Sequence, residues 1–213
     1  MTGVTSSPLR IFWLLAAVFY LNDFVFIYWS GQPSLYFADY AVRIFVLALC
    51  LGLPEVRAIT FQTLSTRRWG WVPLLLVIPM LVVVDRAAHK FVEPMIVEQI
   101  GRTGLFYFGR IENIPLRVFD LTVGLMLVAI SEELVFRKFA LHWLRNAGCG
   151  ALACILISAS IFATMHWGSG VNRVASAFVF GAIAMAVYLR HTRLWPLIVA
   201  HYLSNFIGFA DFD

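Results

Sequence analysis

The sequence predicts an all-α membrane protein, a polytopic transmembrane helical bundle of about seven spans. The first observation is composition: 61% of the 213 residues are hydrophobic and 13% are charged, whereas soluble domains are about half apolar and about one quarter charged. The second is that the apolar residues fall in runs near the length of about 20 residues that crosses a bilayer. The third is that the 16 Lys and Arg residues stand singly between these runs. This distribution gives no basic patch of the kind that binds nucleic acid.

Seven apolar runs are candidate spans, and polar residues interrupt their pattern in two places. The first run contains Asn22 and Asp23. Residues 85–117 form a polar interval that has the apolar spacing of an interfacial helix, and Pro94 predicts an interruption there. The candidate spans are residues 11–29, 40–53, 69–84, 116–144, 149–166, 174–189 and 194–210.

We expect the chain to divide into two parts. Residues 1–115 would form N-terminal transmembrane helices and the interfacial segment, and residues 116–213 would form the core that carries the ionisable groups. Loop Lys and Arg residues are more numerous on the side shared with the N-terminus, which predicts a cytoplasmic N-terminus.

A pair of glutamates lies in the fourth span. An ionisable side chain inside a membrane helix costs about 2.5–3.5 kcal/mol and therefore needs a partner or a task. Glu133 and Arg137 are four residues apart and are expected to pair, which would leave Glu132 free to face a polar cavity. The alternative is a helix end at the membrane interface, with both glutamates solvated.

Two further polar groups interrupt the last spans. His166 ends the fifth run, and His201 and Asn205 share one face of the seventh. The plain alternatives are an interface histidine and an interhelical hydrogen bond. Taken together, a carboxylate, two histidines and an amide are the groups needed for attack of water on an amide carbonyl. In the first two spans, Arg43 is a candidate partner for Asp23.

Helix geometry sets a condition on this arrangement. At 1.5 Å per residue, untilted helices would leave His166 about 10 Å in depth from Glu132 and His201. Either tilt or a helix break near Gly168 must close that gap.

The three motifs occur in a familiar order. They read Glu132-Glu133-x-x-x-Arg137, Phe162-x-x-x-His166 and His201-x-x-x-Asn205. Together they resemble the CPBP family of intramembrane proteases, which includes the Rce1-type CaaX endopeptidases and bacteriocin-processing enzymes. The compact chain also resembles the CaaX-related proteases of bacterial exosortase sorting systems. The resemblance covers residues 116–210.

The resemblance implies a function and a set of roles. The chain would be an endopeptidase that cleaves near the C-terminus of a membrane-associated protein or peptide, a CaaX-type or sorting-tag substrate that can be lipidated. It would need no cofactor and would reside in the inner membrane of a prokaryote. Glu132 would act as general base with His166, and His201 and Asn205 would stabilise the oxyanion. The supporting residues would be Glu133, Arg137 and Phe162.

Other classes remain open at this point. Glu132, His166 and His201 could instead be the ligands of a zinc metalloprotease with an open fourth position, although no H-E-x-x-H motif is present. A serine mechanism at Ser169 would leave the glutamates and Arg137 without a task. A transporter or immunity protein without catalysis would also contain buried polar groups.

Overall fold

The computed structural model describes residues 8–62, 70–106, 108–109 and 111–210, and every regular element in that part of the chain is helical. The predicted all-α bundle is confirmed. The α-helices are α1 (Pro8–Tyr28), α2 (Ser34–Gly52), α3 (Pro54–Phe61), α4 (Trp71–Ala87), α5 (Glu93–Ile100), α6 (Ile114–Phe119), α7 (Leu125–Glu133), α8 (Ala140–Asn146), α9 (Ala151–Thr164), α10 (Val171–His191) and α11 (Trp195–Phe209). The π-helical turns are η1 (Ala88–Val92), η2 (Asp120–Gly124) and η3 (Leu134–Phe139), and η4 (Trp167–Ser169) is a 3-10 turn.

Each of the seven predicted spans coincides with a helix over most of its described residues, and five helical segments are long and apolar enough to cross a membrane. The five are Pro8–Tyr28, Ser34–Gly52, Trp71–Ile100, Ile114–Asn146 and Val171–His191. The apolar helix α9 is shorter, and α11 has 15 residues. Trp69, where the third predicted span begins, lies outside the described residues.

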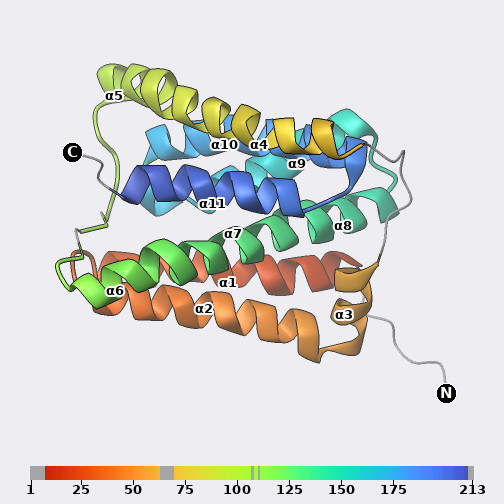
Figure 1. The fold of residues 1–213 in the computed structure, drawn as a ribbon, viewed down its shortest axis with the longest axis horizontal. Coiled ribbons are helices and arrows are strands. Elements are labelled where there is room, and N and C mark those ends of the chain that lie inside the picture. Colours follow the sequence, from red (N-terminus) through yellow and green to blue (C-terminus); the bar gives the residue numbers. More distant parts are fainter. Residues whose placement is uncertain (1–7, 63–69, 107, 110, 211–213) are drawn as a thin grey trace.

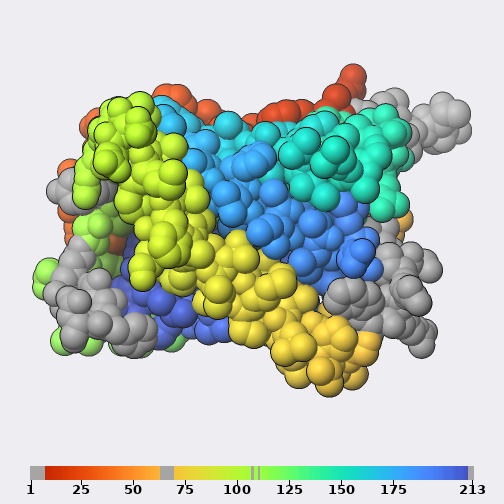
Figure 2. All heavy atoms as spheres, turned by 90° about the horizontal axis from the view of Figure 1, so that it is seen from above, coloured from red at the N-terminus to blue at the C-terminus, as the bar shows by residue number. Residues whose placement is uncertain are grey.

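The helices run roughly side by side in layers (Figure 1). Helices α1 and α2 form one face, and α4 with α5 lies on the opposite face, next to α10 and α11. Figure 2 shows the rod of α4 and α5 crossing this second face beside α10. The rod of α6, α7 and α8 runs between the faces, and α7 contacts both α2 and α11. The division of the chain at residue 115 stays a prediction.

The rod that carries the glutamates is held by contacts around its second π turn. The ring of Phe136 in η3 is fully buried and lies 5.4 Å from the ring of Phe19 and 5.6 Å from that of Phe162. A π turn widens the backbone hydrogen-bonding pattern, and the Ser158 hydroxyl donates to the Phe136 carbonyl at 2.6 Å. This side chain fixes α9 against the glutamate-bearing rod.

One prediction about helix regularity is confirmed, and one boundary needs correction. Pro94 predicts that no long regular helix runs through this region, and the helical segment Trp71–Ile100 is divided there by the π turn η1. The π turn at Ala88–Val92 comes directly before Pro94, and such a turn lets a membrane helix satisfy its backbone around a residue without an N–H. The second span begins at Ser34 rather than at residue 40, since its polar first turns are buried against neighbouring helices.

Candidate active site

Glu132 and Glu133 lie at the end of α7, inside the bundle. They are 2% and 0% exposed, so the alternative of two solvated glutamates at the interface is wrong. The predicted pair between Glu133 and Arg137 is present, with Arg137 Nε 3.0 Å from Glu133 Oε2. The guanidinium of Arg137 also lies 4.4 Å from the centre of the Phe162 ring. The motif therefore contains an ion pair that is fully enclosed.

Glu132 is not free, contrary to the prediction. Arg43 Nη1 lies 2.8 Å from Glu132 Oε1, and Arg43 Nη2 lies 3.0 Å from Asp39 Oδ1. Asn22 Nδ2 donates to the same Asp39 oxygen at 2.8 Å. The charge on Glu132 is thus balanced by α2, through a residue that the sequence motifs do not include. The other carboxylate oxygen, Glu132 Oε2, is buried and accepts no hydrogen bond from a described residue.

The suggested pair between Arg43 and Asp23 is also wrong. Asp23 Oδ2 instead accepts the backbone N–H of Gly168 at 2.9 Å. The Gly168 carbonyl in turn accepts the N–H of Leu105 at 2.7 Å. Asp23 therefore stabilises the segment after α9. The correct partner of Arg43 could have been found from the sequence, because Arg43 follows Asp39 by four residues.

His201 contacts both glutamates. Its Nδ1 forms a hydrogen bond with Glu133 Oε1 at 2.9 Å, and its Nε2 lies 3.8 Å from Glu132 Oε2. The rings of Phe162 and Phe180 lie 6.2 Å and 5.3 Å from the imidazole and restrict its rotation. Glu133 therefore orients His201 so that Nε2 faces Glu132. Sequence reasoning did not find this link between the first and third motifs.

His166 reaches the same region because its helix ends early. α9 stops at Thr164, and the chain turns through His166 (φ −93°, ψ 19°) into the 3-10 turn Trp167–Ser169. This confirms the break expected near Gly168. His166 Nδ1 lies 3.1 Å from the Phe162 carbonyl oxygen. That contact fixes the ring and leaves Nε2 as its second polar atom.

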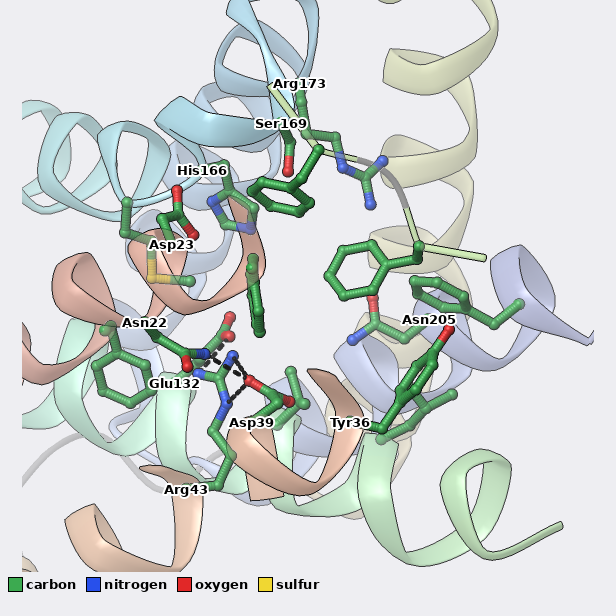
Figure 3. A pocket seen from close by; sticks show the side chains of 18 of the residues that line it. Asn22, Asp23, Tyr36, Asp39, Arg43, Glu132, His166, Ser169, Arg173 and Asn205 are labelled. Atoms are coloured by element: carbon green, nitrogen blue, oxygen red, sulfur yellow. Dashed lines mark hydrogen bonds and ion pairs between the residues drawn. The ribbon is translucent and has the colours of Figure 1, made fainter. Parts of the chain in front are cut away.

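One cavity brings these groups together (Figure 3). Its empty volume is about 830 Å³, which includes open solvent at its mouth, and Glu132, His166, His201 and Asn205 all line it. Figure 3 shows Glu132 and Asn205 on different sides of this space. The Asn205 amide has no hydrogen bond to a described residue, so both of its N–H groups can donate to a bound molecule. The wall also contains aromatic rings from several elements.

The described residues contain no group of side chains that matches the zinc alternative. Among residues 8–62, 70–106, 108–109 and 111–210, no three His, Cys, Asp or Glu side chains are grouped as metal ligands. In addition, the positive guanidinium of Arg43 occupies one oxygen of Glu132 at 2.8 Å. A cation at that carboxylate would have to compete with Arg43.

The turn that carries His166 gives a first prediction. A Cβ at Gly168 would lie 2.6 Å from Phe106 Cε1 and 3.0 Å from Asp23 Oδ2. We expect Gly168→Ala to destabilise the fold by about 1–3 kcal/mol and to lower the melting temperature in detergent. Gly150→Ala is the matched control, since its Cβ meets nothing within 4 Å and its φ is −72°. Equal melting temperatures for the two variants would contradict a tightly packed turn.

The fold and the cavity define a class: a multi-span helical membrane protein with a cavity lined by buried Glu132 and His201 and half-buried His166 and Asn205. Comparison with known proteins then shows what part of the chain is similar to. Residues 114–207 match the family model described as "Type II CAAX prenyl endopeptidase Rce1-like". The segment includes the three predicted motifs and leaves the first 113 residues unmatched. No curated protein and no solved structure matches the chain at a significant level.

Proposed function

We propose that the protein is an intramembrane endopeptidase in which Glu132 and His166 activate a water molecule to cleave a peptide bond near the C-terminus of a membrane-associated protein or peptide. The observation that carries the proposal is that Glu132, His166, His201 and Asn205 line one cavity within a bundle of apolar helices. The Rce1-like match supports a protease of the CAAX type.

Glu132 is suited to the role of general base by the different surroundings of its two oxygens. Oε1 is held by Arg43 at 2.8 Å, so the carboxylate has a defined orientation. Oε2 has no hydrogen-bond partner among the described residues and is the acceptor available to a water molecule. A positioned general base contributes about 10²–10⁴-fold in rate. His166 would hold the same water through Nε2.

The proposed reaction transfers one proton at each stage. The water oxygen bonds to the scissile carbonyl carbon as Glu132 Oε2 takes a proton from it. The carbonyl oxygen becomes an oxyanion, which receives hydrogen bonds from Asn205 Nδ2 and from protonated His201 Nε2. When the C–N bond breaks, the proton on Glu132 passes to the leaving amine nitrogen, and the products are an amine and a carboxylic acid, which then gives its own proton to the amine or to solvent. One such oxyanion donor is worth about 2.7–4 kcal/mol of barrier.

The proposal includes no metal, and it includes the membrane setting predicted above. We place the protein in the inner membrane of a prokaryote with its N-terminus in the cytoplasm. The apolar walls of the cavity suit an aliphatic peptide segment, and a lipid on the substrate would bring that segment to the membrane. CaaX-type and sorting-tag substrates both meet this description.

A cleavage assay tests the function. The purified protein in phosphatidylcholine nanodiscs is incubated with peptides that end in a CaaX box, with and without S-farnesylation of the cysteine. We expect mass spectrometry to show release of the last three residues, at a rate that 1,10-phenanthroline does not change. Failure to cleave either peptide would overturn the proposal for CaaX substrates. Inhibition by the chelator, reversed by added Zn²⁺, would support the metalloprotease alternative.

A further inference from the structure

Two arginines line the cavity, and their surroundings differ. Arg43 comes from α2, its side chain is 7% exposed, and it is paired with Asp39 and Glu132. Arg173 comes from the first turn of α10, and its side chain is 31% exposed. Figure 3 places Arg173 on the side of the cavity opposite Arg43 and Glu132. The cavity therefore has a second cation, far from the proposed general base.

The counterion of Arg173 is shared among several donors. Arg173 Nη1 lies 3.3 Å from Glu93 Oε1. The same oxygen accepts the Ser176 hydroxyl at 2.7 Å and faces His89 Nε2 at 3.4 Å. The other Glu93 oxygen accepts from Asn172 at 3.3 Å. The carboxylate holds the N-terminal turn of α10 against α5, and it neutralises the guanidinium only in part.

The rest of the guanidinium is available to a ligand. Apart from Glu93, the guanidinium of Arg173 has no hydrogen bond or ion pair with a described residue. It lies at the start of the 21-residue helix α10, where the helix dipole adds a favourable field for an anion. Its planar set of N–H donors matches the two oxygens of a carboxylate.

Three packed aromatic rings line the same cavity as Arg173. The cavity wall contains Phe106, Phe108 and Phe209, whose rings pack edge to face with centroids 5.5 and 5.7 Å apart. A cation at one end of an apolar recess suits a peptide that has apolar side chains and ends in a carboxylate. A peptide held by its end at Arg173 and cleaved beside Glu132 would cross the cavity, and three extended residues span roughly 10 Å.

We propose that Arg173 binds the free C-terminal carboxylate of the peptide substrate. The cavity thereby selects chain ends, and the distance from Arg173 to the activated water sets how many residues are released. This inference rests on the proposed function for its substrate. It makes Arg173 a specificity-determining residue, and it requires an unblocked C-terminus.

The binding experiment does not depend on turnover. Full-length Glu132→Gln protein in phosphatidylcholine nanodiscs is titrated with one farnesylated CaaX peptide, as the free acid and as the C-terminal amide. We expect the acid to bind about tenfold or more tightly, the range of one hydrogen-bonded charge. Adding Arg173→Gln should weaken acid binding to the level of the amide, and Arg173→Lys should restore part of the difference. Arg190→Gln, on the exposed far end of the same helix, should change neither.

The cleavage experiment separates this inference from the proposed function. With Glu132 intact, the acid should be cleaved with the lower KM and a similar kcat, and Arg173→Gln should remove that difference. Equal binding of acid and amide overturns the inference, even where both peptides are cleaved. Acid-selective binding through Arg173 without any cleavage supports the inference and overturns the function. A third outcome also overturns the inference. If Arg173→Gln leaves the binding of acid and amide unchanged and alters only the effect of added phosphatidylglycerol on peptide binding, the ligand of Arg173 is a lipid headgroup.

Discussion

Glu132→Gln should remove peptide cleavage while leaving the fold intact, lowering kcat by about 10²–10⁴-fold. Glutamine has nearly the same volume, and its amide oxygen can still receive a hydrogen bond from Arg43, which lies 2.8 Å from Glu132 Oε1. It cannot take a proton from water at the position of Oε2. The expected effect is therefore on kcat, with little change in KM, and it is measured with the CaaX peptides in nanodiscs.

A matched variant controls for the loss of a charge. Glu98 is exposed at the end of α5, so Glu98→Gln removes one carboxylate outside the cavity and should keep the full rate. Melting temperatures and helical circular dichroism show whether each variant is folded. A folded Glu132→Gln protein that cleaves at the normal rate would contradict the general-base assignment. The serine mechanism at Ser169, which also lines the cavity, would then be the next candidate.

Arg43→Met should give the largest loss of stability. Methionine preserves much of the apolar stem but leaves Asp39 and Glu132 as unpaired carboxylates, and these are 8% and 2% exposed. Breaking a buried ion pair from one side costs about 3–5 kcal/mol. Cleavage should fall as well, because Glu132 Oε1 loses the contact that orients the carboxylate. Thermal or denaturant unfolding in detergent measures the first effect, and the peptide assay measures the second.

A combined variant distinguishes charge imbalance from lost packing. Adding Asp39→Asn and Glu132→Gln to Arg43→Met removes every charge of the network. Stability should then recover in large part, because replacing a whole buried ion cluster by neutral groups is often close to neutral in free energy. Activity should not recover, since the base is absent. Equal instability in the single and the combined variants would show that Arg43 stabilises the bundle through packing instead.

The sequence was sufficient for the helices and for one ion pair of the candidate site. Hydropathy placed the last two spans within a few residues of α10 and α11. This works because a helix that crosses a membrane corresponds to an apolar run of about the same length in the sequence. The i, i+4 rule found the pair of Glu133 with Arg137. The gap in depth required either tilt or a helix break near Gly168, and the structure has the break.

The contacts that the sequence missed all join helices distant in the chain. The pairing of Glu132 with Arg43 depends on how α2 is rotated against α7, and the contact of His201 with Glu133 depends on the register of α11 against α7. Neither rotation nor register is visible in one sequence. The spacing of Asp39 and Arg43 on α2 indicated an internal pair, but not the second carboxylate, Glu132, that joins it.

The ion pair between Arg43 and Glu132 joins the matched segment to the unmatched one. Residues 114–207 contain the three motifs that the sequence analysis singled out, yet the cation that balances their first glutamate comes from α2. A chimera that transplants this segment onto foreign leading helices would bury an uncompensated negative charge. Any such graft would therefore need its own guanidinium, and the leading helices belong to the structural support of Glu132.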